Sequence, residues 1–258
     1  MRCLTRLLCV SALLVSVAFA ESLSETRKKA EKGDATAQCN LGSMYDNGDG
    51  VPKDSTEAVK WYRKSAEQGN ATAQFNLGAM HFVAARYSID NGVSKDPVEA
   101  VKWYRRAAEQ GYILAQKQLG FIYANGVGGP KDAVEAAKWY RKAAEQGEVY
   151  AQFDLGTMYD NGNGVLKDRA EAAKWYRKSA EQGYADAQAS LGALYADRDG
   201  VTFNIVQAHA WMNNASANGN EGAKWHLGLI EKLMTPEQIA ESTKLAREIL
   251  ERIQAKKK

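Results

Sequence analysis

The sequence contains little of what covalent or metal chemistry requires. Its 258 residues include three cysteines, three histidines and four prolines. Cys3 and Cys9 lie close to the start of the chain, and His81, His209 and His226 share no spacing that is typical of metal ligands. We therefore expect no metal site and no cofactor.

The familiar catalytic motifs are also missing. Ser-x-x-Lys, Gly-x-Ser-x-Gly and His-Glu-x-x-His do not occur. The loops at residues 46–50 and 160–164 are rich in Asp, Asn and Gly, but they lack the alternating oxygen ligands and the closing Glu of a calcium-binding EF-hand. Because Asn and Gly are typical turn residues, these loops are explained without a ligand. We expect no enzyme activity.

Neither sign of charge dominates, and long apolar runs are absent after the first part of the chain. Lys and Arg number 34, and Asp and Glu number 31. Apart from the basic tail at residues 256–258, nothing resembles the electrostatic footprint of a nucleic-acid-binding protein. No later segment offers the roughly 20 apolar residues that span a bilayer. Neither nucleic acid nor stable membrane insertion is expected.

Residues 1–20 have the pattern of a secretory signal peptide. Arg2 and Arg6 form a basic region, residues 7–17 form an apolar region, and residues 18–20 form an Ala-x-Ala cleavage site. The pattern predicts cleavage and export, to the periplasm or as a secreted protein. An uncleaved N-terminal anchor is the alternative.

Cys39 is the one cysteine that cleavage would leave in the chain. A lone thiol in an oxidising compartment can pair with another chain, although a small buried hydrophobic residue is the commoner role. We expect a monomer, and a dimer linked through Cys39 is the alternative.

What the sequence does contain is a repeat of 36 residues. Leu-Gly pairs recur at spacings of 36, 42, 36, 36 and 36 residues, and the tryptophans from Trp61 to Trp211 recur at 42, 36, 36 and 36. A fixed period of this length is the signature of a solenoid. The one longer spacing indicates a six-residue insertion in the second repeat.

Each period predicts two helices. Residues 34–46 carry apolar side chains on one helical face, and residues 55–68 do the same. Asp54, with Glu57 three residues later, predicts a capped start, and Gly69 predicts a left-handed stop. A pair of about 36 residues buries too little surface to fold alone, so successive pairs must stack.

The ends of the chain are expected to cover this stack. We predict an N-terminal capping helix within residues 21–33, then a solenoid of five full repeats and a partial sixth at residues 34–232. A C-terminal capping helix and basic tail follow at residues 233–258. Its apolar residues Ile239, Leu245, Ile249 and Leu250 should face the stack.

The fourth repeat carries the clearest family pattern. Residues 151–159, the loop 161–165, Asp168, Glu171 and residues 175–180 resemble the Sel-one-like repeat, a subclass of tetratricopeptide-like repeats. The resemblance covers about residues 33–228. It implies an all-α fold, a right-handed α-solenoid of stacked antiparallel helix pairs whose first helices line a concave face.

Candidate binding residues come from comparing the first helices position by position. The second residue after the Ala-Gln pair, or after the equivalent pair in the last copy, is polar in all six copies. These residues are Asn40, Asn76, Gln118, Asp154, Ser190 and His226. In related tetratricopeptide grooves, such side chains hold an extended peptide backbone. A polar stripe that binds a protein or peptide is one interpretation, and a merely solvated helix face is the other.

The neighbouring position holds three aromatic residues, Phe75, Phe153 and Trp225. These could anchor a partner or pack between repeats. We expect packing for Phe75 and Phe153. Trp225 belongs to the terminal repeat, where the C-terminal capping helix could cover it.

The signal-peptide pattern and the resemblance together predict an exported scaffold that binds a protein or peptide on its concave face. The alternative is the weak β-lactam binding or hydrolysis of a cysteine-rich exported subfamily. The cysteines that staple each hairpin of that subfamily are absent from this chain.

Overall fold

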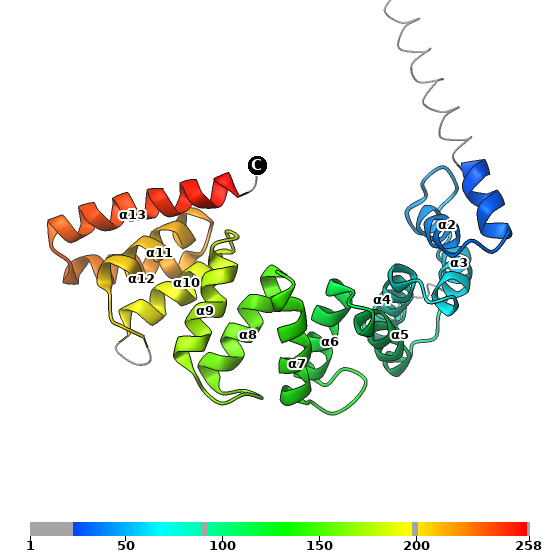
Figure 1. The fold of residues 1–258 in the computed structure, drawn as a ribbon, viewed down its shortest axis with the longest axis horizontal. Coiled ribbons are helices and arrows are strands. Elements are labelled where there is room, and N and C mark those ends of the chain that lie inside the picture. Colours follow the sequence, from blue (N-terminus) through cyan, green and yellow to red (C-terminus); the bar gives the residue numbers. More distant parts are fainter. Residues whose placement is uncertain (1–22, 89–91, 198–200, 257–258) are drawn as a thin grey trace, which may run out of the picture. The chain divides into compact units, whose positions relative to one another are not determined.

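The computed structural model describes residues 23–88, 92–197 and 201–256, and every regular element among them is a helix (Figure 1). The expected signal peptide at residues 1–20 lies outside the described residues. The chain divides into two compact units. The first comprises Met1–Gln116 with Val127–Gly129, and the second comprises Lys117–Gly126 with Pro130–Lys258.

The first unit begins with a short helix over residues 23–31. It continues with α2 (Ala35–Asn47), α3 (Ser55–Glu67), α4 (Ala71–Tyr87) and α5 (Pro97–Glu109). Helix α6 (Ile113–Asn125) begins in the first unit, and most of its residues belong to the second.

The second unit contains the remaining helices. They are α7 (Ala133–Glu145), α8 (Val149–Asn161), α9 (Arg169–Ala180), α10 (Ala185–Ala196), α11 (Ile205–Ala217), α12 (Glu221–Ile230), the 3-10 turn η1 (Glu231–Leu233) and α13 (Pro236–Ala255). Within each unit, the helices of a hairpin pack against each other, as α2 does with α3 and α8 with α9, and the last helix, α13, packs against α11. The predicted stack of antiparallel helix pairs is confirmed.

The predicted caps define the second helix of each pair. The Asp54 side chain accepts a hydrogen bond from the Glu57 backbone N–H at 3.0 Å, which satisfies a donor that has no partner within the helix. Asp132 and Asp168 cap their helices in the same way. At the other end, Gly69 and its four equivalents have φ between +88° and +93°. The predicted starts and stops are therefore confirmed.

The Leu-Gly pair explains how two helices of one hairpin approach each other. Leu155 and its equivalents in the other full repeats are 0% exposed. A Cβ atom at Gly156 would lie 2.7 Å from Cδ1 of Tyr176, so only glycine admits the tyrosine ring. Glycine inside a helix costs about 1 kcal/mol relative to alanine. Burial of the ring, worth roughly 2 kcal/mol, offsets that cost.

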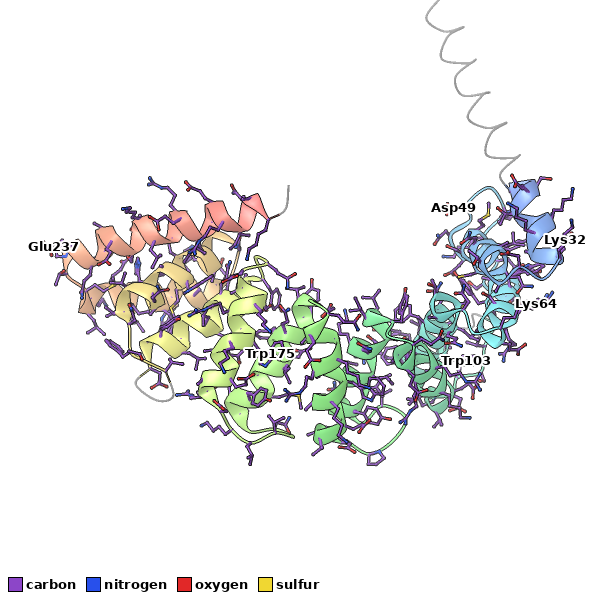
Figure 2. All side chains as sticks on the ribbon, viewed as in Figure 1. Lys32, Asp49, Lys64, Trp103, Trp175 and Glu237 are labelled. Carbon is purple, nitrogen blue, oxygen red and sulfur yellow. The ribbon has the colours of Figure 1, made fainter. Side chains whose placement is uncertain are left out.

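The repeated Trp-Tyr-Arg-Lys segment packs rather than pointing freely into solvent. Trp175, labelled in Figure 2, is buried. The Lys178 ammonium lies 3.9 Å from the centre of its ring. Arg177 donates a hydrogen bond to the hydroxyl of Tyr195 in the next first helix. The basic side chains therefore cover the aromatic core and join neighbouring repeats.

The insertion of the second repeat lengthens its first helix. Helix α4 has 17 residues, whereas α2 has 13. His81, which replaces the tyrosine of other repeats, is buried, and its Nδ1 lies 3.1 Å from the Ser94 carbonyl oxygen. The predicted enlarged segment at residues 84–91 is thus partly helix, and residues 89–91 lie outside the described part of the chain.

The last helix, α13, packs mainly against α11. It starts with a reciprocal capping box between Thr235 and Gln238. Its buried residues are Ser242, Ala246, Ile249 and Ile253. Among the predicted residues, Ile249 is buried and Leu245 is half-buried against the same core cluster, so the predicted face is confirmed for these two. Ile239 and Leu250 are half-buried.

Candidate partner-binding site

The six residues of the predicted polar stripe are distributed over both units. Asn40 and Asn76 lie on α2 and α4, and the other four lie on α6, α8, α10 and α12. Asn40 and His226 are exposed, whereas the remaining four are half-buried. The stripe therefore has members in both units, and a single site formed by all six residues stays a prediction.

Three of the half-buried stripe residues satisfy buried tyrosine hydroxyl groups. Asn76 is hydrogen-bonded to Tyr62, Asp154 to Tyr140, and Ser190 to Tyr176. Each tyrosine belongs to the second helix of the preceding repeat. These polar side chains therefore have a packing role that the sequence comparison missed, since the contact joins residues of different repeats.

Asp154 is the one acidic residue of the stripe, and its surroundings change its acidity. Burial raises the pKa of its carboxyl group to about 6, and the negative charge of Glu148 acts in the same direction. The hydrogen bond from Tyr140 and the positive charge of Lys117 oppose this shift. The Asp154 carboxyl group is thus poised to change charge near neutral pH.

Aromatic and charged groups gather beside Asp154 on the second unit. The Lys117 ammonium lies 3.3 Å from the Glu148 carboxylate and 5.2 Å from the centre of the Tyr150 ring. Tyr150 is 49% exposed, and its ring meets that of Tyr184 edge to face with 5.2 Å between centres.

The Tyr184 hydroxyl donates a hydrogen bond of 2.9 Å to the Asp186 carboxylate. We call this surface the α6–α10 face and define it by Lys117, Glu148, Tyr150, Asp154, Tyr184 and Asp186. It combines two tyrosine rings with charges of both signs. Tyrosine is enriched at protein interfaces, whereas Lys, Glu and Asp are depleted there.

The aromatic residues beside the stripe behave in two ways. The ring centres of Phe75 and Tyr104 are 5.5 Å apart, and those of Phe153 and Tyr176 are 5.6 Å apart. Both phenylalanines therefore pack, but these contacts lie within one repeat and not between repeats as expected. Trp225 is 65% exposed. The prediction that the capping helix covers Trp225 was wrong, because α13 lies along α11 instead.

A ladder of buried glutamines also escaped the sequence comparison. The amide of Gln152 donates to the Ala144 carbonyl at 3.1 Å and accepts from Gln182 at 2.8 Å. Gln74 does the same with Ala66 and Gln110. The invariant Ala-Gln pair of the repeats was the available signal, and its role is to satisfy backbone groups at the ends of second helices.

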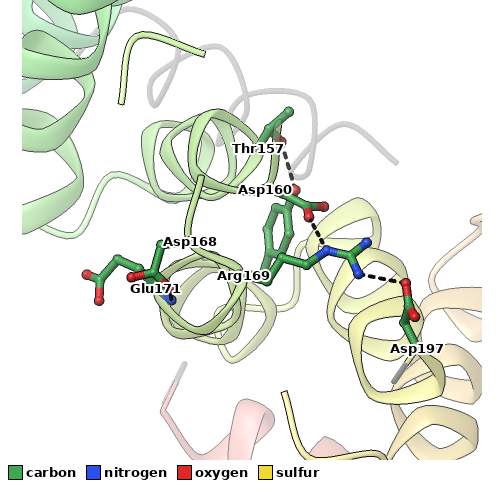
Figure 3. A network of polar contacts seen from close by, with 7 residues as sticks. Thr157, Asp160, Asp168, Arg169, Glu171 and Asp197 are labelled. Atoms are coloured by element: carbon green, nitrogen blue, oxygen red, sulfur yellow. Dashed lines mark hydrogen bonds and ion pairs between the residues drawn. The ribbon is translucent and has the colours of Figure 1, made fainter. Parts of the chain in front are cut away.

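A charged network joins three consecutive helices of the second unit (Figure 3). Arg169 lies between Asp160 and Asp197, with N–O distances of 3.0 Å and 2.7 Å. Close by, the Tyr176 hydroxyl lies 3.2 Å from Thr157 Oγ1. Each of these groups bonds within the protein, so the network fixes α8, α9 and α10 relative to one another.

One cluster has the residue types of a hydrolase triad. The Ser242 hydroxyl oxygen lies 2.8 Å from Nδ1 of His209, and Nε2 of His209 lies 3.2 Å from the Glu231 carboxylate. Ser242 is 0% exposed, and its hydroxyl also bonds the Ile239 carbonyl. A substrate has no access to this oxygen, so the cluster serves to attach α13 to α11.

Three further observations concern the expected thiol, metal and membrane chemistry. Cys39 is a buried free thiol, and burial raises its pKa. Among the described residues, His, Cys, Asp and Glu side chains form no group of three that could hold a metal ion. None of the described helices is long and apolar enough to cross a membrane.

Comparison with known proteins agrees with this architecture. The family model of the Sel1 repeat matches this chain five times, at residues 35–70, 71–112, 113–148, 149–184 and 185–220. A crystal structure of a Sel1 repeat protein from Oxalobacter formigenes is 36% identical, with a TM-score of 0.72. The match covers 94% of this chain and 99% of that one.

A second similar structure is a protective antigen present in uropathogenic Escherichia coli strains, which displays an SLR fold. It is 34% identical with a TM-score of 0.60, and the match covers 92% of this chain and 57% of that one. No curated protein sequence matches. The five matched repeats and their buried Leu-Gly and tyrosine contacts show that the chain belongs to the Sel1 repeat family.

Proposed function

We propose that this chain is an exported scaffold that binds a protein or peptide partner on the face formed by its first helices. Proteins built from Sel1 repeats are generally protein-interaction scaffolds. The observation that carries the proposal for this chain is the α6–α10 face, where two tyrosine rings meet beside charges of both signs.

The chemistry of this face suits an extended segment of a partner. Tyrosine rings contribute a large contact area at a small cost in side-chain entropy, and they are enriched among residues that dominate binding energy. Lys117 and Asp186 offer a cation and an anion to groups of opposite charge on the partner. The exposed stripe residues Asn40 and His226 add hydrogen-bonding groups on their own helices.

A crosslinking pull-down from the envelope fraction of the producing cells tests the proposal. The double variant Tyr150→Ala/Lys117→Ala should recover roughly tenfold less partner, because both substitutions remove contacts at the centre of the face. Tyr87→Ala is the matched control, since Tyr87 is an exposed tyrosine outside the face. Unchanged capture by the double variant would rule out the α6–α10 face as the binding site.

The export part of the proposal rests on the signal-peptide pattern at residues 1–20. The protein purified from its native cells should have the mass of a chain that starts at Glu21. A mass that includes Met1 would contradict cleavage.

The proposal that the protein is a scaffold without enzyme activity has a separate test. Turnover of the β-lactam nitrocefin by the purified protein would contradict it.

A further inference from the structure

Helix α12 is the first helix of the partial sixth repeat. Unlike the first helices of the complete hairpins in the second unit, it has no second helix of its own packed against it. Gly228 occupies the position of Gly156, which receives the Tyr176 ring. No described atom lies within 4 Å of a Cβ placed at Gly228. Leu227, whose equivalents are 0% exposed, is only half-buried. The surface that seats a second helix elsewhere is therefore open here.

The connection between α12 and α13 explains why this surface is open. Seven residues separate α8 from α9, whereas five residues separate α12 from α13, and three of these form η1. The short link does not allow the loop of the other repeats, and α13 packs mainly against α11 (Figure 1). Met212 occupies the position of the tyrosines that fill the glycine notches of other repeats. The residue 36 positions later is Glu248, which is exposed, so α13 does not place this side chain in a notch.

The open surface is apolar. Trp225 and Leu229 lie four residues apart on α12 and share one face of the helix, and Leu233 follows in η1. Their exposed fractions are 65%, 42% and 76%. In the two other repeats that carry an aromatic residue at this position, it packs against the second helix, as Phe75 does against Tyr104 and Phe153 against Tyr176. Exposed apolar groups of this size mark interaction sites.

The other repeats show what kind of element fits this surface. Helix α9 covers the equivalent surface of α8 with Ala172, Tyr176 and Ala180, which are all buried. Small residues let the helices approach, and the tyrosine ring fills the glycine notch. We infer that α12 binds an amphipathic helix of a partner protein, one that presents an aromatic ring between two alanines at intervals of four residues.

The natural probe is a peptide with the sequence of residues 168–183, which contains α9. Labelled with fluorescein, it should bind the purified chain with a dissociation constant on the order of 0.1 mM, because a short peptide must also form its helix. The same peptide with Tyr176→Ala should bind about tenfold more weakly. Absence of binding up to about 1 mM would overturn the inference.

Two protein variants locate the binding. Gly228→Leu fills the notch and should abolish binding, and Trp225→Ala should weaken it about tenfold. Gly129→Leu is the matched control, since a Cβ at Gly129 also meets nothing within 4 Å. Circular dichroism confirms that each variant is folded. Equal peptide binding by the wild type and Gly228→Leu would overturn the inference.

A second copy of the chain is the competing occupant. Sedimentation of the wild type should show a monomer at about 50 µM. A dimer that Gly228→Leu abolishes would overturn the assignment to a partner helix and place another copy on α12. This test is independent of the α6–α10 face, because Tyr150→Ala leaves the α12 surface intact.

Discussion

At the scale of single residues, the accuracy of sequence reasoning depends on how local each contact is. The cap of Asp54 and the φ of Gly69 follow from neighbours within three residues, and both were predicted. The hydrogen bond between Asn76 and Tyr62 joins separate repeats, and it was not predicted. A polar side chain on a helix is compatible with solvent, a partner or a buried hydroxyl, and only the packing selects among them.

Asp154 predicts a pH dependence of stability. Its pKa is about 6 in the folded protein and has an ordinary value of 3.8. The folded state holds the proton more tightly, so this contribution to stability is fully present below pH 3.8 and is lost as the pH rises through 6. Asp154→Asn should therefore raise the free energy of unfolding by about 1 kcal/mol at pH 7.5 and have little effect at pH 4.

Thermal or urea unfolding at the two pH values measures this difference. The comparison with Asp49→Asn, a substitution at an exposed loop carboxylate, provides the control. An equal effect of Asp154→Asn at both pH values would contradict the assigned role of burial.

Cys39 predicts a thiol that reacts only when the protein opens. Burial hides the sulfur and raises its pKa, so little thiolate forms at neutral pH. In the native protein, reaction with a thiol reagent should be at least about tenfold slower than in urea. Immediate reaction of the folded chain would show an accessible thiol and would favour the Cys39-linked dimer.

At the scale of helices, the same sequence position has different roles in different repeats. Gly156 and Gly228 follow a leucine at equivalent positions of α8 and α12. One receives a tyrosine ring and the other receives nothing among the described atoms. The repeat pattern predicted both helices, but it did not predict that a short link would place α13 on α11.

Alanine substitution at these two glycines should have opposite effects. Gly156→Ala brings a methyl group to 2.7 Å from Tyr176 and should destabilise the protein by about 2 kcal/mol. Gly228→Ala meets no atom and improves helix propensity, so it should stabilise by up to about 1 kcal/mol. Urea unfolding of both variants measures the difference. Destabilisation of similar size in both would contradict the open surface on α12.

At the scale of the whole molecule, the repeat made the architecture predictable. Each unit is a stack in which every helix pair contacts its sequence neighbours, so a local period of 36 residues specifies the packing. The candidate site was less predictable. Tyr150, Tyr184 and Lys117 occupy positions that vary between repeats, and no motif marks their proximity.

We predict that partner contact is concentrated on the α6–α10 face. A photo-reactive amino acid placed at position 150 should crosslink to a partner in the producing cells, whereas the same group at position 87 should not. Tyr150 and Tyr87 are both exposed tyrosines, so the comparison is matched for size and accessibility. The most direct measurement is the yield of crosslinked partner at the two positions. A high yield at 150 and none at 87 is predicted, and equal yields or a yield only at 87 would contradict the account.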